Sequence, residues 1–380
     1  MRIAIVTETF VPHVNGIVRM LTAYLSYLQR HGHEAILFAP GAGPASYGGY
    51  EIVWISGVPF PLYPELVLAP YSTRMGQRLR TWQPDVVHLA GPFVLGMHGL
   101  SVARALGVPT AAHYQTDIVR YADHFGLGAL GSLAWRRLLA IHNAATVTFA
   151  PTPSVARDLT RRGMQRVHEC GRGVDTDLFH PARRSLVCRA ALTTTRDKPL
   201  LLYVGRLSVE KNVALLSAVA RALPDYPLVV VGDGPARALL VREMADCNVH
   251  FTGVLHGTDL AAVYASADIF LFPSETETFG QVVREAMASG LPVVGVRAGG
   301  VQDVIRGGET GLLCRPGDRA GFIAAVRLLA MRLSLCTQMG ADARRDAERH
   351  SWDATFDHLM GWYAGMAHPQ ATLAAVGGAV

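Results

Sequence analysis

The chain is organised around one stretch, which reads SETETFGQVVREAMASG from Ser274 to Gly290. It follows the apolar run Asp268–Pro273, a pattern that predicts a buried strand ended by the proline. Apolar residues between Val282 and Met287 recur at helical spacing, and Gly290 is typical of a helix C-terminus. We therefore predict a strand, a tight turn and the first turns of a helix.

The turn in this stretch combines features of an anion site with features of a sugar site. Thr278, Phe279 and Gly280 fall where a helix has free backbone N–H groups, which favour anions, and a glycine allows close approach. Glu277 and Glu285 supply carboxylates, which accept hydrogen bonds from sugar hydroxyls. The pattern therefore favours a nucleotide-sugar ligand. Taken alone, Glu277 also fits an ordinary acidic residue at a helix start.

Composition limits the possible classes of protein. The chain has 380 residues, half of them hydrophobic, which is enough for two domains with sizeable cores. Its five scattered cysteines lack C-x-x-C spacing, which favours a reducing cytoplasm and argues against structural zinc. The net charge of +5 suits anionic lipid surfaces or phosphorylated ligands, but no basic run is dense enough to indicate nucleic acid. We also expect no signal peptide and no membrane span.

Predicted strands and helices alternate along the chain, and the pattern occurs twice. Near-continuous apolar strands in such a series predict parallel sheets covered on both faces by helices. The charged, threonine-rich segment 183–197 reads as a linker. We therefore predict an α/β fold with two doubly wound, Rossmann-like domains, residues 1–180 and 181–350, facing a cleft. A closing helix and frayed tail are expected over 351–380. Segment 58–70 lacks clear periodicity and is expected to be a packed loop, with a surface that meets an apolar acceptor as the alternative.

The first half of the chain offers four candidate residues. Gly16 opens a predicted helix, where it fits either close approach of a ligand or an ordinary turn. His113, Gln115 and Asp117 come at the end of a predicted strand, where ligand crevices form in α/β sheets. If the strand continues, His113 and Gln115 share a face. A buried, hydrogen-bonded histidine explains His113 equally well.

In the second half, Arg206 and Lys211 lie five residues apart in the loop after a predicted strand. An arginine fork and a lysine point charge can converge on a diphosphate. Together with the turn amides they would stabilise the charge that grows on a departing nucleoside diphosphate. Each cation alone also fits a solvated loop charge. The nearby run Gly232–Arg237 begins like a dinucleotide fingerprint but has Arg237 where the third glycine belongs, which argues against a redox cofactor.

At these residues the chain resembles the retaining GT-B glycosyltransferases of the family 4 type, over nearly its whole length. The motif E-x7-E is present as Glu277 and Glu285, and the run E-A-M-A-S-G begins at Glu285. The motif G-R-x4-K is present as Gly205, Arg206 and Lys211. The combination is much more specific than any single motif.

The resemblance implies a role for each matched residue. Arg206 and Lys211 would bind the diphosphate, Glu285 the ribose and Glu277 the donor sugar. The family also implies base contacts near Val254 and Leu255. It further implies that no cofactor or metal is required, and that the anomeric configuration is retained.

One motif departs from the usual family pattern. Many members read [YF]-H-T-[DN] where this chain has YQTD from Tyr114 to Asp117, so Gln115 takes the position of the family histidine. His113 lies two residues earlier, and whether it replaces that histidine is open. The variant resembles actinobacterial GDP-mannose-dependent mannosyltransferases that act on lipids, as do the runs Leu89–Pro92 and Arg172–Asp175.

The sequence thus predicts a cytoplasmic glycosyltransferase, with peripheral contact to the inner face of the plasma membrane as a further option. Its expected reaction moves a hexose, mannose first, from a nucleotide diphosphate to a hydroxyl of a lipid-linked acceptor. One alternative is a UDP-sugar-dependent enzyme of the glucosyl- or sulfoquinovosyl-diacylglycerol type. Another is a non-catalytic protein that binds nucleotide-sugars.

Overall fold

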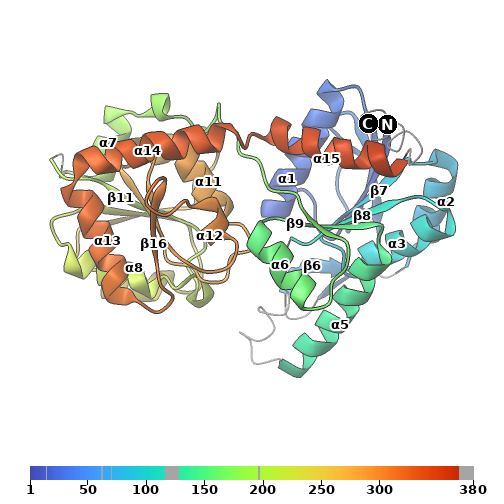
Figure 1. Cartoon of the computed structure of the whole chain (residues 1–380), viewed down its shortest axis with the longest axis horizontal. Coiled ribbons are helices and arrows are strands. Elements are labelled where there is room, and N and C mark those ends of the chain that lie inside the picture. The colour runs from blue at the N-terminus through green and yellow to red at the C-terminus, as the bar shows by residue number, and fades with distance from the viewer. Residues whose placement is uncertain (14, 61–62, 70, 116–127, 196, 368–380) are drawn as a thin grey trace, which may run out of the picture. The chain divides into compact units, whose positions relative to one another are not determined.

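The computed structural model describes residues 1–13, 15–60, 63–69, 71–115, 128–195 and 197–367. Its contacts divide the chain into two compact units. Unit 1 holds the chain up to Gly171 and the segment from Trp352 on, and unit 2 runs from Arg172 to Ser351. The C-terminal helix therefore belongs with the N-terminal part of the chain, as the red ribbon beside helix α1 shows (Figure 1).

Unit 1 is built on an eight-stranded sheet in the order β10-β9-β8-β7-β1-β2-β4-β3. All neighbours pair in parallel except β3 and β4. Parallel strands covered on both faces explain the continuous apolar runs of the sequence. The strands are β1 (Arg2–Thr7), β2 (Glu34–Pro40), β3 (Ser46–Tyr47), β4 (Tyr50–Ile55), β7 (Val86–Ala90), β8 (Thr110–His113), β9 (Val147–Ala150) and β10 (Val167–Glu169).

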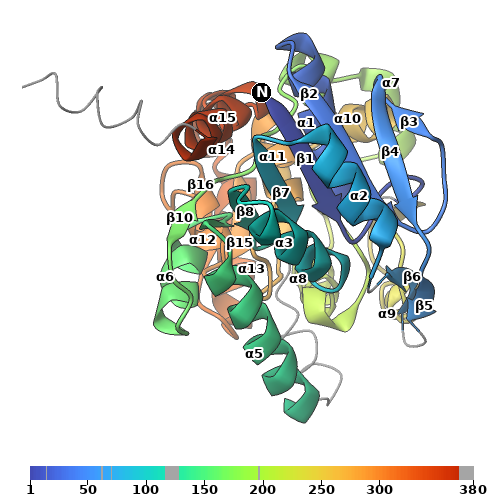
Figure 2. The same ribbon diagram turned by 90° about the vertical axis from the view of Figure 1, so that its right-hand side faces the viewer.

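Helices cover both faces of this sheet. Because successive side chains of a strand point to opposite faces, Ile3 and Ile5 pack with α1 and α15, whereas Ala4 and Val6 pack with α2 and α3. Helices α2 and α3 lie together on one face (Figure 2). The helices are α1 (Gly16–Arg30), α2 (Thr73–Trp82), α3 (Leu95–Ala105), α5 (Gly128–Ala144), α6 (Pro153–Arg161) and α15 (Trp352–Ala367).

Unit 2 is built on a six-stranded parallel sheet in the order β13-β12-β11-β14-β15-β16. Leu201 and Tyr203 face a core closed by α8 and α13, and Leu202 and Val204 face a core closed by α10 and α11. The strands are β11 (Leu201–Val204), β12 (Leu228–Val231), β13 (Val249–Gly253), β14 (Ile269–Phe272), β15 (Val293–Val296) and β16 (Gly311–Cys314). The helices are η1 (Pro181–Arg183), α7 (Leu186–Leu192), η2 (Val209–Lys211), α8 (Ala214–Ala222), α9 (Arg237–Glu243), α10 (Gly257–Ser266), α11 (Gln281–Ala288), α12 (Val301–Val304), α13 (Arg319–Met331) and α14 (Leu333–Glu348).

The division between the units differs from the boundary expected after residue 180. Contacts change at Gly171, because the next residues already pack in unit 2. Val174 and Phe179 are buried in its core, and the side-chain amide of Gln281 donates a hydrogen bond to the Gly173 carbonyl at 2.9 Å. The expected closing helix, α15, contributes its buried face to the core of unit 1.

Segment 58–70 was expected to be a packed loop, and this expectation is wrong for its described residues. Strands β5 (Val58–Phe60) and β6 (Tyr63–Leu68) pair antiparallel in a small sheet of their own. A two-residue hydrophobic alternation arises where one face of a strand is buried in a core. Strands β5 and β6 belong to neither main sheet, so the segment lacks the two-residue hydrophobic alternation that would have predicted strands.

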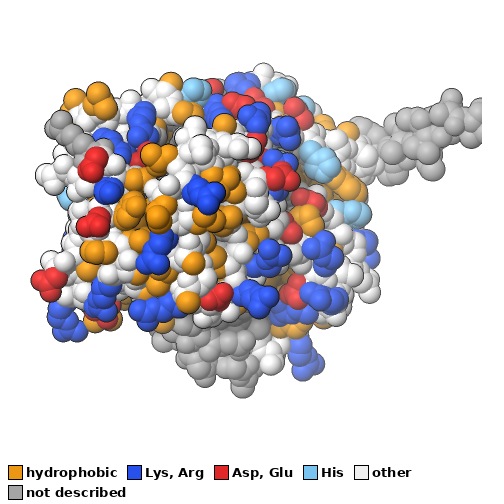
Figure 3. Space-filling view, turned by 60° about the vertical axis from the view of Figure 1, so that its left-hand side comes forward, with side chains coloured by type: hydrophobic (Ala, Val, Ile, Leu, Met, Phe, Trp, Pro, Cys, Tyr) orange, Lys and Arg blue, Asp and Glu red, His pale blue; other side chains and the backbone are white. Residues whose placement is uncertain are grey.

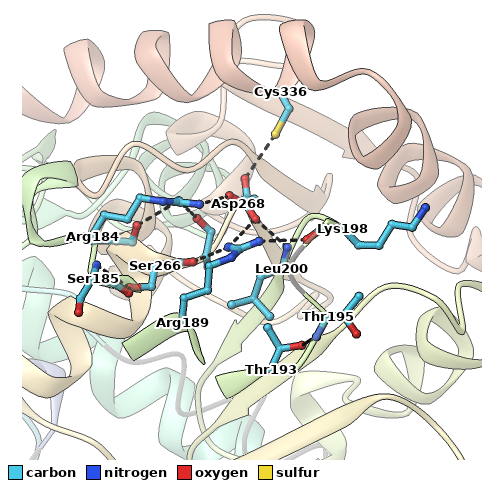
Figure 4. Close-up of polar contacts among 12 residues, drawn as sticks. Arg184, Ser185, Arg189, Thr193, Thr195, Lys198, Leu200, Ser266, Asp268 and Cys336 are labelled. Atoms are coloured by element: carbon cyan, nitrogen blue, oxygen red, sulfur yellow. Dashed lines mark hydrogen bonds and ion pairs between the residues drawn. The ribbon is translucent and has the colours of Figure 1, made fainter. Parts of the chain in front are cut away.

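A cluster of ionic contacts ties the linker to the sheet of unit 2 (Figure 4). Arg184 and Arg189 both reach the Asp268 carboxylate, at 2.9 and 2.8 Å. The same carboxylate accepts a hydrogen bond from the Leu200 backbone N–H at 2.7 Å. Leu200 and Asp268 directly precede β11 and β14, so the linker is fixed at the amino ends of the central strands.

The outer helices of unit 2 carry exposed apolar side chains. Leu186 and Val187 on α7, and Met331 and Leu333 around the junction of α13 and α14, are each more than half exposed. Figure 3 shows hydrophobic side chains lying among lysines and arginines on one face of the molecule. The outer faces of these helices are therefore not uniformly polar, because they mix apolar with basic residues.

Candidate functional site

The stretch from Ser274 to Gly290 has the predicted arrangement of strand, turn and helix. Strand β14 ends at Phe272, and α11 begins at Gln281. Gly280 enters the helix with φ of +81°, in the left-handed region that favours glycine. A Cβ at this position would lie 3.1 Å from the Val301 side chain, so the site is also tight. The backbone at the start of α11 therefore depends on a glycine.

The two loops predicted to hold the diphosphate and the sugar meet in unit 2. Lys211 forms an ion pair with Glu277, and both side chains are about four-fifths buried. Thr276 donates its hydroxyl to the Glu210 carbonyl at 3.2 Å, and Asn212 donates to the Pro273 carbonyl at 3.4 Å. Three contacts thus fix the loop after β11 to the loop after β14, both at the carboxyl edge of the sheet.

Arg206 lies in the same loop, and its side chain is exposed. Its backbone carbonyl accepts a hydrogen bond from the buried Tyr203 hydroxyl at 3.0 Å. Burial and the nearby Glu277 and Glu210 carboxylates raise the pKa of Tyr203, so the hydroxyl keeps its proton and remains a donor. A Cβ on Gly205 would lie 2.9 Å from this hydroxyl, which explains the glycine of the motif.

The remaining predicted residues of unit 2 occupy different environments. Glu285 is buried on α11, where its carboxylate accepts a hydrogen bond from the Tyr264 hydroxyl at 3.2 Å. Phe279 is buried in the core below the turn, and Thr278 is half-buried. Val254 and Leu255 follow β13 at the same edge of the sheet, Val254 exposed and Leu255 packed against the core.

The predicted residues of the first half lie in unit 1. Gly16 is the first residue of α1, and the Asn15 side chain before it accepts hydrogen bonds from the N–H groups of Ile17 and Val18, at 3.0 Å each. Gln115 is buried at the end of β8. Asp117 lies outside the described residues.

His113 is a buried residue with aromatic neighbours. Its ring stacks on His88, with 4.2 Å between centroids, and its Nε2 lies 3.5 Å from the Tyr363 hydroxyl. The same hydroxyl lies 2.6 Å from Nδ1 of His88. Burial lowers the pKa of His88 to about 3, so this ring is neutral. The buried-histidine alternative fits these contacts.

Sequence reasoning gave no site role to two buried or partly buried charged residues, Glu8 and Arg172. Glu8 accepts hydrogen bonds from the backbone N–H groups of Phe93, Leu95 and Gly96, at 2.8, 3.2 and 2.9 Å, and so joins the loop after β1 to the start of α3. The pKa of Glu8 is raised above its usual value, because the effect of burial outweighs the opposing effect of these hydrogen bonds.

The second residue is Arg172. It is partly buried, and burial lowers its pKa to about 10, while the neighbouring Glu277 carboxylate raises it. In the sequence, the run from Arg172 to Asp175 indicates only a resemblance to a subfamily. Its position next to Glu277 depends on a contact across more than a hundred residues, which no local pattern reveals. Among the described residues, no group of three or more His, Cys, Asp or Glu side chains is placed to hold a metal ion.

Comparison with known proteins identifies the family. The profile of Glycosyltransferase Family 4 matches residues 14–178, and that of Glycosyl transferases group 1 matches residues 198–331. A GDP-mannose-dependent alpha-mannosyltransferase of Mycolicibacterium smegmatis is 40% identical over 96% of this chain and 97% of its own. The chain belongs to glycosyltransferase family 4. This glycosyltransferase is also 33% identical to the sulfoquinovosyl transferase of Arabidopsis thaliana, over 90% of this chain and 69% of that protein.

Solved structures place the glycosyltransferase in the GT-B fold, with two Rossmann-like domains. HepE of Anabaena, in complex with UDP and glucose, superposes with a TM-score of 0.76 at 18% identity, covering 96% of this chain and 100% of that one. In the part of the chain that the structure describes, no single helix could cross a membrane by length and hydropathy. Within the described ranges, helices α13 and α14 taken together, with a bend of 100° between them, meet that test by length and composition.

Proposed function

We propose that this glycosyltransferase transfers mannose from GDP-mannose to a hydroxyl of a lipid-linked acceptor, with retention of the anomeric configuration. The observation that carries the donor assignment is the full-length similarity, at 40% identity, to a GDP-mannose-dependent alpha-mannosyltransferase. The ion pair between Lys211 and Glu277 also supports the donor assignment, because a cation can bind the diphosphate and a neighbouring carboxylate can bind the sugar hydroxyls.

In this proposal each group of the donor loops has one task. Arg206 and Lys211 bind the diphosphate and stabilise the negative charge that grows as the sugar leaves. Glu277 accepts hydrogen bonds from the sugar hydroxyls, and Glu285 from the ribose. The N–H groups at the start of α11, from Gly280 on, add the partial positive charge of a helix end.

The acceptor hydroxyl would attack from the face that the diphosphate leaves. A leaving phosphate oxygen can take the acceptor's proton, so the reaction demands no strong base from the protein and no metal. Val254 and Leu255 would lie against the base. Gly16 would allow close approach of the donor, and His113, Gln115 and Asp117 are proposed as further catalytic residues.

The acceptor is proposed to be a lipid because one related protein is an alpha-monoglucosyldiacylglycerol synthase by name, and because unit 1 exposes Val58 and Tyr71, each about 70% accessible. Arg74 is exposed close by in sequence, and exposed apolar and basic side chains together favour an anionic lipid surface. We therefore propose a cytoplasmic enzyme that touches the inner membrane face.

A second candidate is a UDP-linked donor, which the similarity to a sulfoquinovosyl transferase favours. The two are separated by measuring release of GDP or UDP from GDP-mannose, UDP-glucose and UDP-sulfoquinovose, with and without lipid extract. We expect GDP release that rises with lipid, and its loss in Lys211→Gln and Glu277→Gln. Preference for a UDP donor would replace the proposal with the second candidate, and no release from any donor would refute both.

A further inference from the structure

The ion pair between Lys211 and Glu277 poses a problem for the proposed reaction, on which the present inference rests. Without a ligand, each group neutralises the other within a largely buried pair. A diphosphate that binds Lys211 draws its ammonium group away from Glu277. A largely buried carboxylate that loses its cation is disfavoured where it stands, so Glu277 would lose its position unless another cation holds it.

Arg172 is a second cation near Glu277, close enough for the two charges to interact. The backbone next to it is fixed to the donor site, because Gln281, the first residue of α11, donates a hydrogen bond to the Gly173 carbonyl at 2.9 Å. Val174 then donates its backbone N–H to the His350 carbonyl at 3.0 Å and is buried in the core. Arg172 is therefore held one residue from an anchored peptide at the N-terminus of the helix that follows Glu277.

The polar groups around Glu277 come from three segments. The cations are Lys211, from the loop after β11, and Arg172, from the start of unit 2, and the neutral Tyr203 hydroxyl comes from β11. Glu210, in the same loop as Lys211, adds a second carboxylate, which accepts a hydrogen bond from Ser208. Arg206, in the same loop, is a third cation and acts on Glu210 together with Lys211. The diphosphate needs Arg206 and Lys211, so Arg172 is the cation of these three that stays available to Glu277.

We propose that Arg172 is a positioning residue for the donor sugar, which holds the Glu277 carboxylate in its orientation once the diphosphate has engaged Lys211. Arg172 itself does not contact the phosphates. Arginine suits this task because it stays charged when partly buried and its planar fork orients a carboxylate. Removal of Arg172 therefore affects recognition of the sugar and leaves recognition of the nucleoside diphosphate intact.

The test compares GDP with GDP-mannose on the full-length protein. Calorimetry gives the dissociation constant for each ligand, and turnover gives kcat and KM, for wild type, Arg172→Gln, Arg172→Lys and Lys211→Gln. We expect Arg172→Gln to change GDP affinity by no more than about twofold, while its affinity for GDP-mannose and its kcat each fall by at least about tenfold. Arg172→Lys restores the charge and is expected to recover part of both losses. Lys211→Gln is expected to weaken both ligands.

A matched control is Arg242→Gln, which removes an exposed arginine from α9 and is expected to change neither ligand's affinity. Equal weakening of GDP and GDP-mannose in Arg172→Gln would overturn the inference, because it would make Arg172 a phosphate ligand. Unchanged affinities and kcat would overturn it as well. If Arg172→Gln does not fold, Arg172→Lys is compared with wild type instead. The inference then still requires a lower affinity for GDP-mannose with an unchanged affinity for GDP.

Failure of the proposed function gives a different result. One such result is wild-type protein that binds GDP-mannose more tightly than GDP but transfers no sugar. This result would refute the proposed transfer, and the binding comparison would still test the role of Arg172. A UDP preference would move the same comparison to UDP and its sugar. The double variant Arg172→Gln/Glu277→Gln adds a further check, since its loss of GDP-mannose affinity should be no larger than that of Glu277→Gln alone.

Discussion

At the scale of single residues, the donor loops depend on a buried hydroxyl that the motif does not include. The Tyr203 hydroxyl donates to the Arg206 carbonyl and lies against Gly205. Tyr203→Phe keeps the ring but leaves this carbonyl without its donor, which typically costs about 1 kcal/mol. We expect a loss of stability of that size in urea unfolding. We also expect weaker GDP binding by calorimetry, because the Arg206 loop is less well positioned.

A suitable control for this prediction is Tyr226→Phe. Tyr226 is a partly buried tyrosine in the same unit, with Lys198 placed 5.7 Å from its ring centre. Its hydroxyl has no described contact with the donor loops, so GDP affinity should stay at the wild-type value. Equal GDP affinities of wild type and Tyr203→Phe would show that the hydroxyl does not position the loop.

A second prediction at this scale concerns pH. His88 is buried among Tyr24, His113 and Tyr363, and burial lowers its pKa to about 3 from an ordinary 6.5. In the unfolded chain the ring gains a proton below pH 6.5, whereas in the folded protein it stays neutral down to about pH 3. The unfolding free energy should therefore fall as pH falls from 6.5 toward 3, by about 1.4 kcal/mol per pH unit from this group.

The measurement is urea unfolding between pH 7.5 and 4.5 for wild type and His88→Gln. The variant loses stability at neutral pH, because the residue is buried, but its stability should depend less steeply on pH. His250→Gln, which changes an exposed histidine, should keep the wild-type dependence. Parallel curves for wild type and His88→Gln would contradict the prediction.

At the scale of elements, the linker helix α7 is held by charge rather than by a large apolar face. Arg189 contacts the Asp268 carboxylate at 2.8 Å and also donates to the carbonyls of Ser266 and Lys198, at 2.7 and 3.0 Å (Figure 4). Arg189→Gln leaves these acceptors short of donors, and we expect a loss of about 2 kcal/mol in unfolding free energy. GDP affinity should not change, because the cluster lies at the amino ends of β11 and β14.

Arg183→Gln is the matched control, since Arg183 is an exposed linker arginine with weaker contacts, at 3.3 and 3.4 Å, to the Asp177 carbonyl. Its loss should stay within about 0.5 kcal/mol. Similar losses for the two variants would mean that the Asp268 cluster has no special role in holding the linker.

The elements also show what the sequence could and could not predict. The strand and helix around Ser274–Gly290 were predictable, because a buried parallel strand and an amphipathic helix each leave a local pattern. Convergence of Lys211 on Glu277 was predictable only through the motifs, since the two residues are 66 positions apart. The ion pair between Arg189 and Asp268 joins residues 79 positions apart, and no local pattern or family motif connects them. It could therefore not be predicted from the sequence. The β5–β6 pair was missed because neither strand lies in a main sheet.

At the scale of the whole molecule, unit 1 is assembled from both ends of the chain. Helix α15 completes its core through Phe356, which is 1% exposed and packs against the rings of Tyr24 and Tyr27, with centroids 4.9 and 5.4 Å away. Two polar links support this contact, from Tyr27 to Asp357 and from Arg30 to Asp353. Phe356→Ala removes a large buried side chain, and we expect it to destabilise unit 1 by about 3–5 kcal/mol.

Because the donor residues Lys211 and Glu277 belong to unit 2, the same substitution should leave GDP binding nearly intact. Differential scanning calorimetry with and without GDP can separate these effects, since a bound ligand stabilises only the folded part that holds it. In Phe356→Ala we expect a transition at lower temperature that GDP does not shift, and a second one that GDP raises as in wild type. Leu186→Ala, which truncates a side chain that is 83% exposed, should change neither transition. A proportional loss of GDP affinity in Phe356→Ala would instead mean that the two units fold as one, and that the C-terminal helix supports the donor site as well.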